Sequence, residues 1–309
     1  MSSRTLNEIA PAFVSRPREE LKVIARETLA AVKRGSYTDD AQQTHQLPDL
    51  STVAGSTIYF DAEASGTTQQ TTARETPTEW VLYQASTLQG IRFCLQNAEK
   101  LAILNFASAT SPGGGFLGGA RAQEETLARS SNLYSSLTSA TGKPFYSAHN
   151  TKSDPRFSHA MLYTKNVRFV RNDAGSWLAP ADVDVLTCAA VNVNALRKTL
   201  GIRGREDSPL PEDVKEEVST IMRERMARIL SVFARNGATD IVLGSFGTGA
   251  FRNSVEFVAR TWAELLFGPF KDVFRRVVFA IIDEGSWRMF ADVFREVGVQ
   301  FIEEKAEPI

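Results

Sequence analysis

"LAILNFASATSPGGGFLGGARAQEETLARSSNLY" (residues 101–134) places five glycines between an apolar run and a segment with helical spacing. Residues 101–106 have the length and apolar content of a buried strand, and a helical pattern begins near Arg121. "GSFGTGAFRNS" (residues 244–254) repeats this order, because it follows the apolar run "DIVL" and precedes "VEFVARTWAELLF". Both stretches therefore predict a strand, a glycine-rich loop and a helix.

The rest of the chain alternates in a similar way. Apolar runs of strand length lie at 79–83, 100–107, 159–171, 184–192, 240–246 and 275–283, and helical patterns lie near 121–138 and at 212–236, 254–267 and 286–296. Continuous apolar strands separated by helices predict an α/β fold with a mostly parallel sheet, covered on both faces.

The N-terminal part differs from this core. Residues 15–35 predict an amphipathic helix, with Pro17 near its start and Gly35 past its end. Residues 36–79 are polar, and only "STIYF" (56–60) has the character of a strand, so we expect an irregular extension that is mobile around 61–76. We divide the chain into an N-terminal helix and extension (1–79) that packs on the core, and the core itself (80–309).

The two glycine loops are candidate phosphate sites, since ligands of such sheets bind where the carboxyl ends of strands run into helices. Glycine allows positive φ and a close approach of N–H groups, which favour phosphate at a helix N-terminus. One such loop is often only a tight connection, but two at equivalent strand ends favour a nucleotide diphosphate. Neither loop has the lysine of a nucleoside-triphosphate loop or the spacing of dinucleotide oxidoreductases, so kinase and redox functions are disfavoured.

Glu124 and Glu125 stand at the beginning of a predicted helix. Carboxylates there often only complement the helix dipole, which would explain one of them. Adjacent helical residues point about 100° apart, so the two acids cannot perform one task, and one can bind while the other reacts. A carboxylic acid beside a bound sugar suits protonation of a glycosidic leaving oxygen.

The stretch 101–134 resembles the signature of bacterial-type poly(ADP-ribose) glycohydrolases, a triple glycine followed by Gln-Glu-Glu. The resemblance extends to "REELKVIARETLAAVKRGSY" (18–37), "CAAVNVNALR" (188–197) and "LGSFGTGAFRNS" (243–254), and covers most of the chain outside 36–79. It implies a macrodomain, a three-layer α/β/α sandwich with a mixed, mostly parallel central sheet, that binds ADP-ribose.

The resemblance also implies roles for individual residues. Glu125 would be the general acid at the ribose–ribose bond, and Glu124 and Asn105 would bind ribose hydroxyls. The catalytic loop would be formed by Gly113, Gly114 and Gly115, and Gln123 would complete the motif. These four residues would also be among those that bind the substrate. The second loop would bind the diphosphate, with Phe251 against the distal ribose; its members are Ser245, Gly247, Thr248, Gly249, Ala250 and Phe251. We place Gly249 at the closest approach of the backbone to the diphosphate.

Composition limits the other functions. Lys+Arg 35 against Asp+Glu 36 gives a formal net charge of −1, so no general basic field attracts nucleic acid. Cys94 and Cys188 lie in apolar runs and are expected to be buried, without a disulfide. His45, His149 and His159 are scattered, so we predict no metal, and we expect no organic cofactor.

Several segments are interpreted as surface or as plain soluble sequence. Residues 171–180 and the arginines of "MRERMARIL" (222–230) are typical of solvated or helix-pairing surfaces, so any polymer should bind in the cleft rather than through sequence-specific nucleic-acid contacts. The N-terminus lacks the apolar core of a signal peptide, and no run approaches a membrane span. We expect an intracellular, soluble protein.

Three functions remain open from the sequence. The first is a glycohydrolase that releases ADP-ribose from poly(ADP-ribose), with ADP-ribose, its polymer and poly-ADP-ribosylated proteins as partners. The larger animal-type enzymes add an accessory domain and a tyrosine-bearing clasp that this sequence does not show, so we expect cleavage at chain ends. The alternatives are a module that binds ADP-ribose without turnover and a hydrolase of mono-ADP-ribosylated substrates.

Overall fold

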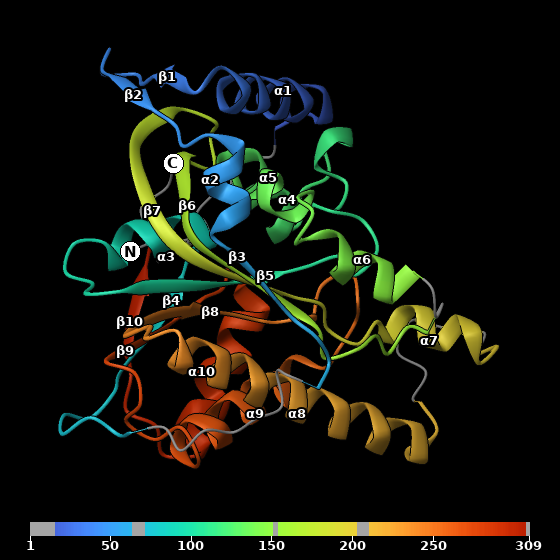
Figure 1. Ribbon diagram of the computed structural model, residues 1–309. Helices are drawn as coiled ribbons and strands as arrows, with labels where there is room; N and C mark the ends of the chain where they lie inside the picture. The colour runs from blue at the N-terminus through green and yellow to red at the C-terminus, as the bar shows by residue number, and fades with distance from the viewer. Residues whose placement is uncertain (1–15, 64–71, 151–153, 203–209, 307–309) are drawn as a thin grey trace, which may run out of the picture.

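The computed structural model describes residues 16–63, 72–150, 154–202 and 210–306, and all statements below concern these ranges. Its centre is an eight-stranded mixed sheet of order β10-β4-β9-β8-β5-β7-β6-β3 (Figure 1). The strands are β3 (Thr57–Phe60), β4 (Glu79–Gln84), β5 (Leu101–Phe106), β6 (Met161–Arg171), β7 (Trp177–Cys188), β8 (Asp240–Leu243), β9 (Arg276–Ala280) and β10 (Ile302–Lys305). Neighbours are parallel from β10 to β7, whereas β6 is antiparallel to both β7 and β3.

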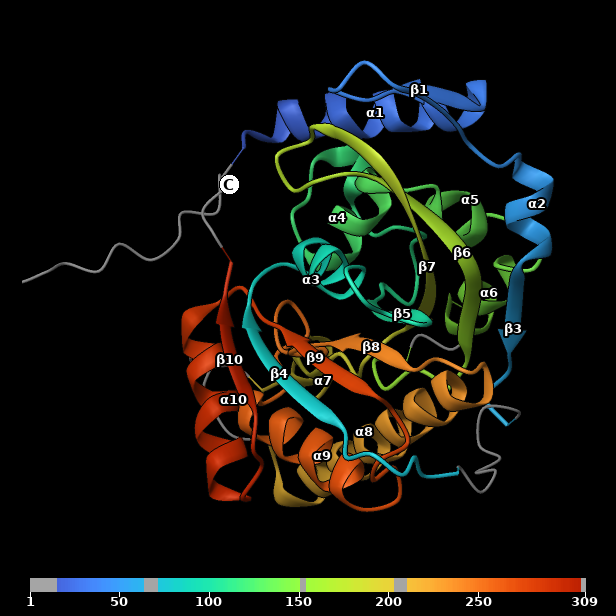
Figure 2. The same ribbon diagram turned by 90° about the vertical axis from the view of Figure 1, so that its left-hand side faces the viewer.

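Helices cover both faces of the sheet, as Figure 2 shows. One layer holds α3 (Thr87–Cys94), α4 (Gln123–Ser130), α5 (Leu133–Leu137) and α6 (Lys143–Asn150). The other holds α8 (Glu212–Arg235), α9 (Val255–Phe267) and α10 (Glu284–Glu296), with the short α7 (Val193–Thr199) after β7. Two separate hydrophobic clusters fill the spaces between the sheet and these layers. The predicted α/β/α sandwich with a mixed, mostly parallel sheet is confirmed.

The N-terminal segment lies outside the α4 layer. Helix α1 (Arg18–Arg34) ends at Gly35, whose φ of 81° is left-handed, as the sequence predicted. The segment that follows is more regular than predicted, because it forms a hairpin of β1 (Ser36–Thr38) and β2 (Thr44–Gln46) and the helix α2 (Leu50–Gly55) before the predicted strand β3. Residues 64–71, part of the stretch predicted to be mobile, lie outside the described residues. The division of the chain into an extension (1–79) and a core (80–309) stays a prediction.

The single helix predicted near 121–138 is wrong. Ser131 is extended, with φ −152° and ψ 179°, and separates α4 from α5. Its hydroxyl donates to the Leu127 carbonyl and accepts from the Leu133 N–H, and its backbone forms an isolated bridge with Phe169. The Ser131 side chain therefore forms hydrogen bonds with nearby backbone groups, and these bonds compete with those of a continuous helix.

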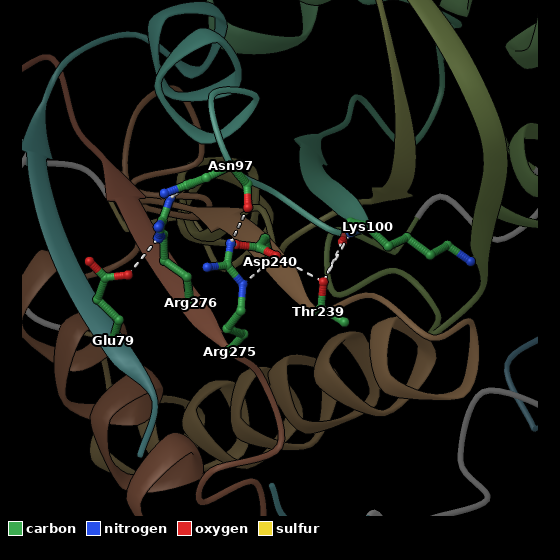
Figure 3. A network of polar contacts seen from close by, with 7 residues as sticks. All are labelled: Glu79, Asn97, Lys100, Thr239, Asp240, Arg275 and Arg276. Atoms are coloured by element: carbon green, nitrogen blue, oxygen red, sulfur yellow. Dashed lines mark hydrogen bonds and ion pairs between the residues drawn. The ribbon is translucent and has the colours of Figure 1, made fainter. Parts of the chain in front are cut away.

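Polar contacts fix the amino ends of the parallel strands (Figure 3). Arg276 at the start of β9 contacts Glu79 of β4 through Nε, at 2.7 Å from Oε2. Its neighbour Arg275 forms an ion pair with Asp240, which begins β8 and is buried. The Thr239 hydroxyl donates to Asp240 and accepts from the N–H of Lys100, just before β5. This network lies at the amino ends of the strands, whereas the glycine loops follow the carboxyl ends.

Candidate active site

The two glycine loops adjoin because β5 and β8, which they follow, are parallel neighbours in the sheet. The second loop, the residues just after β5 and the start of α4 line one cavity of about 770 Å³ beyond the carboxyl ends of the strands. This cavity has the size of a small-molecule site. The lining includes these residues that the sequence singled out: Gln123, Glu124, Glu125, Ser245, Gly247, Thr248, Gly249, Ala250 and Phe251.

The second loop presents backbone donors to the cavity. Within the described part of the chain, the N–H groups of residues 245, 247, 249, 250 and 251 donate no hydrogen bond. The loop is shaped by a turn in which the Thr248 N–H and hydroxyl both donate to the Ser245 carbonyl, at 3.2 and 2.9 Å. Ser254 then caps α9 by accepting from the Phe257 N–H. Unused N–H groups before a helix N-terminus favour an anion.

The glycines of this loop have different explanations. Gly247 has a φ of 74°, and a Cβ there would overlap Ala190 and lie 2.9 Å from Nδ2 of Asn253, so the fold itself requires a glycine. A Cβ at Gly249 would meet nothing within 4 Å. Gly249 is therefore free of constraint from the protein, and its predicted close approach to the diphosphate stays a prediction.

The first residue of α4, Gln123, fixes the start of this helix on the sheet. Its Oε1 accepts from the Phe106 N–H at 2.9 Å, and its Nε2 donates to the Leu104 carbonyl at 2.7 Å and to the Thr87 hydroxyl at 3.2 Å. Both ends of the amide are thereby used within the protein. Gln123 holds the acid pair at the end of β5, and a contact between Gln123 and substrate stays a prediction.

Glu124 lines the cavity but is almost fully buried. It is 2% exposed, accepts from the Ser108 N–H at 2.6 Å, and lies 3.4 Å from Nδ2 of Asn105. Burial raises the pKa of the Glu124 carboxyl to about 8, and the hydrogen bond from Ser108 offsets only part of this effect. Asn105 is buried behind Glu124 and also donates to the hydroxyl of Thr187 on β7.

Glu125 has one oxygen fixed and one available. Oε1 accepts from the Gly115 N–H at 2.9 Å, whereas Oε2 has no hydrogen-bond partner among the described residues. Glu125 lines the cavity, and this second oxygen is itself shielded from solvent. The backbone bond to Gly115 orients the carboxyl group, as general acid catalysis requires.

The three glycines are not among the residues that line the cavity; Gly114 and Gly115 lie against Glu125, and Gly113 lies against Phe116 and Ala128. Gly113 and Gly114 both have left-handed φ, 67° and 57°. A Cβ at Gly114 would overlap Oε1 of Glu125, lie 2.9 Å from its Cδ and lie 3.2 Å from Oε2 of Glu124. Bare backbone stands beside the paired acids because the carboxyl group of Glu125 occupies the space that a side chain would need.

The sequence did not point to Asp173. It lies in the β6–β7 hairpin, within the segment interpreted as solvated surface, but it lines the cavity and accepts from the Ser86 hydroxyl at 2.6 Å. Burial raises its pKa. Arg171 of the same segment is buried and Asp173 is partly buried, so neither is the solvated surface residue that the sequence suggested. No local signal could have shown this, because the burial comes from contacts with distant parts of the chain.

Metal binding and thiol chemistry depend on the other titratable side chains of the described ranges. Within the ranges that the structure describes, no group of three or more His, Cys, Asp or Glu side chains could hold a metal ion. Cys94 and Cys188 are free and buried, as predicted, and burial raises the pKa of each thiol to about 12. Burial also lowers the pKa of His149 to about 4. Among the described helices, none is long and apolar enough to cross a bilayer.

One side of the cavity is lined by the loop whose N–H groups at 245, 247, 249, 250 and 251 have no acceptor among the described residues, and another side is lined by the acid pair of Glu124 and Glu125. The fold and the site thus define the class as a glycosidase of a phosphate-bearing sugar. The family model described as "Microbial-type PARG, catalytic domain" matches residues 25–172, where PARG denotes poly(ADP-ribose) glycohydrolase. No match was found among curated protein sequences.

Solved structures give the closer comparison. The poly(ADP-ribose) glycohydrolase of Thermomonospora curvata is 34% identical, with 89% of this chain and 100% of that chain covered and a TM-score of 0.77; a second structure of it holds the inhibitor ADP-HPD. The Deinococcus radiodurans enzyme in complex with ADP-ribose is 32% identical, with 82% and 99% covered and a TM-score of 0.71. The chain belongs to the family of microbial-type poly(ADP-ribose) glycohydrolases, which are glycosidases acting on poly(ADP-ribose).

Proposed function

We propose that this chain hydrolyses the ribose–ribose O-glycosidic bonds of poly(ADP-ribose) and releases ADP-ribose from chain ends, with Glu125 as the general acid. One observation carries the assignment of the acid: Glu125 lines the cavity with one oxygen held by the Gly115 N–H and the other without a partner among the described residues. Because Oε1 accepts the hydrogen bond from the Gly115 N–H, the proton of the acid is placed on Oε2.

In the proposed reaction, the distal ribose lies between the acid pair and Phe251, and its diphosphate accepts hydrogen bonds from the loop at 245–251. Glu125 protonates the oxygen that leaves with the preceding unit, so that the bond to the anomeric carbon breaks through an oxocarbenium-like state. Water then adds to that carbon and gives a proton to the Glu125 carboxylate, so that free ADP-ribose results and the acid is regenerated. Glu124 and Asn105 hold the ribose hydroxyls, and poly-ADP-ribosylated proteins supply the polymer.

Two alternatives predict different products. A binding module would hold ADP-ribose without turnover, and a mono-ADP-ribosyl hydrolase would act on a single modified side chain. Purified protein should therefore be given poly(ADP-ribose) and a mono-ADP-ribosylated peptide in parallel, with released ADP-ribose measured by mass spectrometry. The proposal expects release from the polymer at least about tenfold faster than from the peptide, a difference of ~1.4 kcal/mol in activation free energy. Early products that contain only ADP-ribose support cleavage at chain ends, and early oligomers contradict it.

A further inference from the structure

Arg225 is a buried cation that the proposed reaction does not use. It lies on α8, has 0% of its surface exposed, and belongs to the stretch 222–230 that the sequence analysis interpreted as surface. Burial lowers the pKa of its guanidinium to about 10. A buried charge is costly unless hydrogen bonds satisfy it, so its partners identify what this side chain holds in place.

Its partners are backbone carbonyls and a ring nitrogen. Nη1 donates to the carbonyl of Ala189 at 2.9 Å, and Nη2 donates to those of Arg156 and Phe157 at 2.9 and 3.1 Å. Nε lies 3.4 Å from Nδ1 of His159. No carboxylate accepts a hydrogen bond from Arg225 among the described residues. The guanidinium therefore joins the turn after β7 to the loop before β6.

The two joined segments support the diphosphate loop. The Asn253 side chain donates from Nδ2 to the carbonyls of Val191 and Gly247, at 2.8 and 2.9 Å, and so ties that loop to the turn after β7. The Asn194 N–H donates to the carbonyl of Phe251 at 3.1 Å. Ala190, next to the carbonyl that Arg225 holds, occupies the space in which a Cβ at Gly247 would lie.

The loop before β6 also contacts the diphosphate loop and the turn after β7. Its Phe157 has a left-handed φ of 55°, and its carbonyl is one of those that Arg225 holds. The ring of Phe157 lies with its centroid 6.1 Å from that of Phe251, which lines the cavity. The Pro155 carbonyl accepts from the Asn192 N–H at 2.8 Å, which closes the assembly.

We propose that Arg225 is a positioning residue: its guanidinium fixes the segments at 154–159 and 189–194 as a platform that holds the diphosphate loop and Phe251 in the conformation that binds ADP-ribose. The inference rests on the proposed role of residues 245–251 in the diphosphate site. Arg225 acts from behind the loop and does not reach the ligand. A planar fork with several donors suits this task, and a lysine ammonium can replace only part of it.

The test uses the full chain with Arg225→Met and Arg225→Lys, and Arg171→Met as the matched control. Arg171 is also buried and also holds a carbonyl, that of Gly175, together with Thr28 and Glu27 of α1, but none of these partners contacts the diphosphate loop. ADP-ribose affinity is measured by calorimetry, and KM and kcat by release of ADP-ribose from polymer. Circular dichroism defines a temperature at which each variant is folded.

Because the diphosphate loop binds the ground state and the transition state alike, its displacement should raise KM and leave kcat nearly unchanged. Arg225→Met should weaken ADP-ribose binding by about tenfold or more and raise KM to match, with kcat within about threefold of wild type. Arg225→Lys should restore part of the affinity, and Arg171→Met should bind normally.

The inference is overturned if folded Arg225 variants bind ADP-ribose as wild type does. It is also overturned if both Arg225 variants fail to fold while Arg171→Met folds, because the guanidinium then serves the fold as a whole. Failure of the wild-type protein itself to bind ADP-ribose or to degrade polymer would reject the proposed function instead, so the two failures are distinguishable.

Discussion

Gly114→Ala tests whether the bare backbone exists to admit the carboxyl group of Glu125. The new Cβ would lie 2.9 Å from Cδ of Glu125 and closer still to Oε1, whereas ordinary contacts begin at 3.4 Å. The carboxyl group must therefore shift by roughly 0.5 Å or more, and because a shift of ~1 Å can cost on the order of 10² in rate, we expect kcat to fall by about ten- to a hundredfold. The left-handed φ of 57° adds a loss of about 1–2 kcal/mol in the free energy of unfolding.

The assay measures release of ADP-ribose from poly(ADP-ribose) by mass spectrometry, beside calorimetry of ADP-ribose binding and thermal unfolding. Gly118→Ala is the matched control, since it lies just past the same loop, is exposed, and a Cβ there would meet nothing within 4 Å. It should keep wild-type activity. If Gly114→Ala turns over polymer within about threefold of wild type, the proposed link between this glycine and the acid is wrong.

Three further predictions concern the proton of Glu124, the diphosphate loop and metal ions. The pKa of Glu124 is raised to about 8, so between pH 4.5 and 8 the unfolded chain has lost a proton that the folded chain keeps. As pH rises through this window, the free energy of unfolding of wild type should therefore fall relative to that of Glu124→Gln. A difference between the two proteins that stays constant in calorimetry from pH 5 to 8 would argue against the raised pKa. Gly249→Val should weaken ADP-ribose binding with little loss of stability, whereas Gly247→Ala should lower the melting temperature; unchanged affinity of Gly249→Val would remove Gly249 from the phosphate site. Hydrolysis should persist in excess chelator, and a loss of turnover that an added divalent ion restores would contradict metal independence.

The sequence predicted the features that depend on local pattern. The strands that lead into the glycine loops and the helices α1, α8, α9 and α10 follow from apolar spacing and end signals, because burial of one face imposes a period on the side chains. Gly35 ended α1 as expected, since glycine accepts the left-handed conformation without strain.

Features that arise from long-range packing could not be predicted in this way. Ser131 breaks the helix through a bridge to Phe169, 38 residues away by number, and β10 carries charged Glu303 and Glu304 at its exposed edge, which hides its strand character. Asp173 and Arg225 lie in polar segments that are typical of a surface. Asp173 is partly buried against the Ser86 hydroxyl, and Arg225 is buried against three carbonyls from other loops. No pattern in their own segments records these distant partners.

The central claim is that Glu125 supplies the proton, and Glu125→Gln tests it most directly. Glutamine keeps the size and the acceptor for the Gly115 N–H but has no proton of the required acidity. ADP-ribose should therefore bind as it does to wild type, while hydrolysis of poly(ADP-ribose) falls by at least the ~10²–10⁴ that general acid catalysis contributes. Degradation of the polymer by Glu125→Gln at close to the wild-type rate, followed in a gel or by mass spectrometry, would contradict the mechanism.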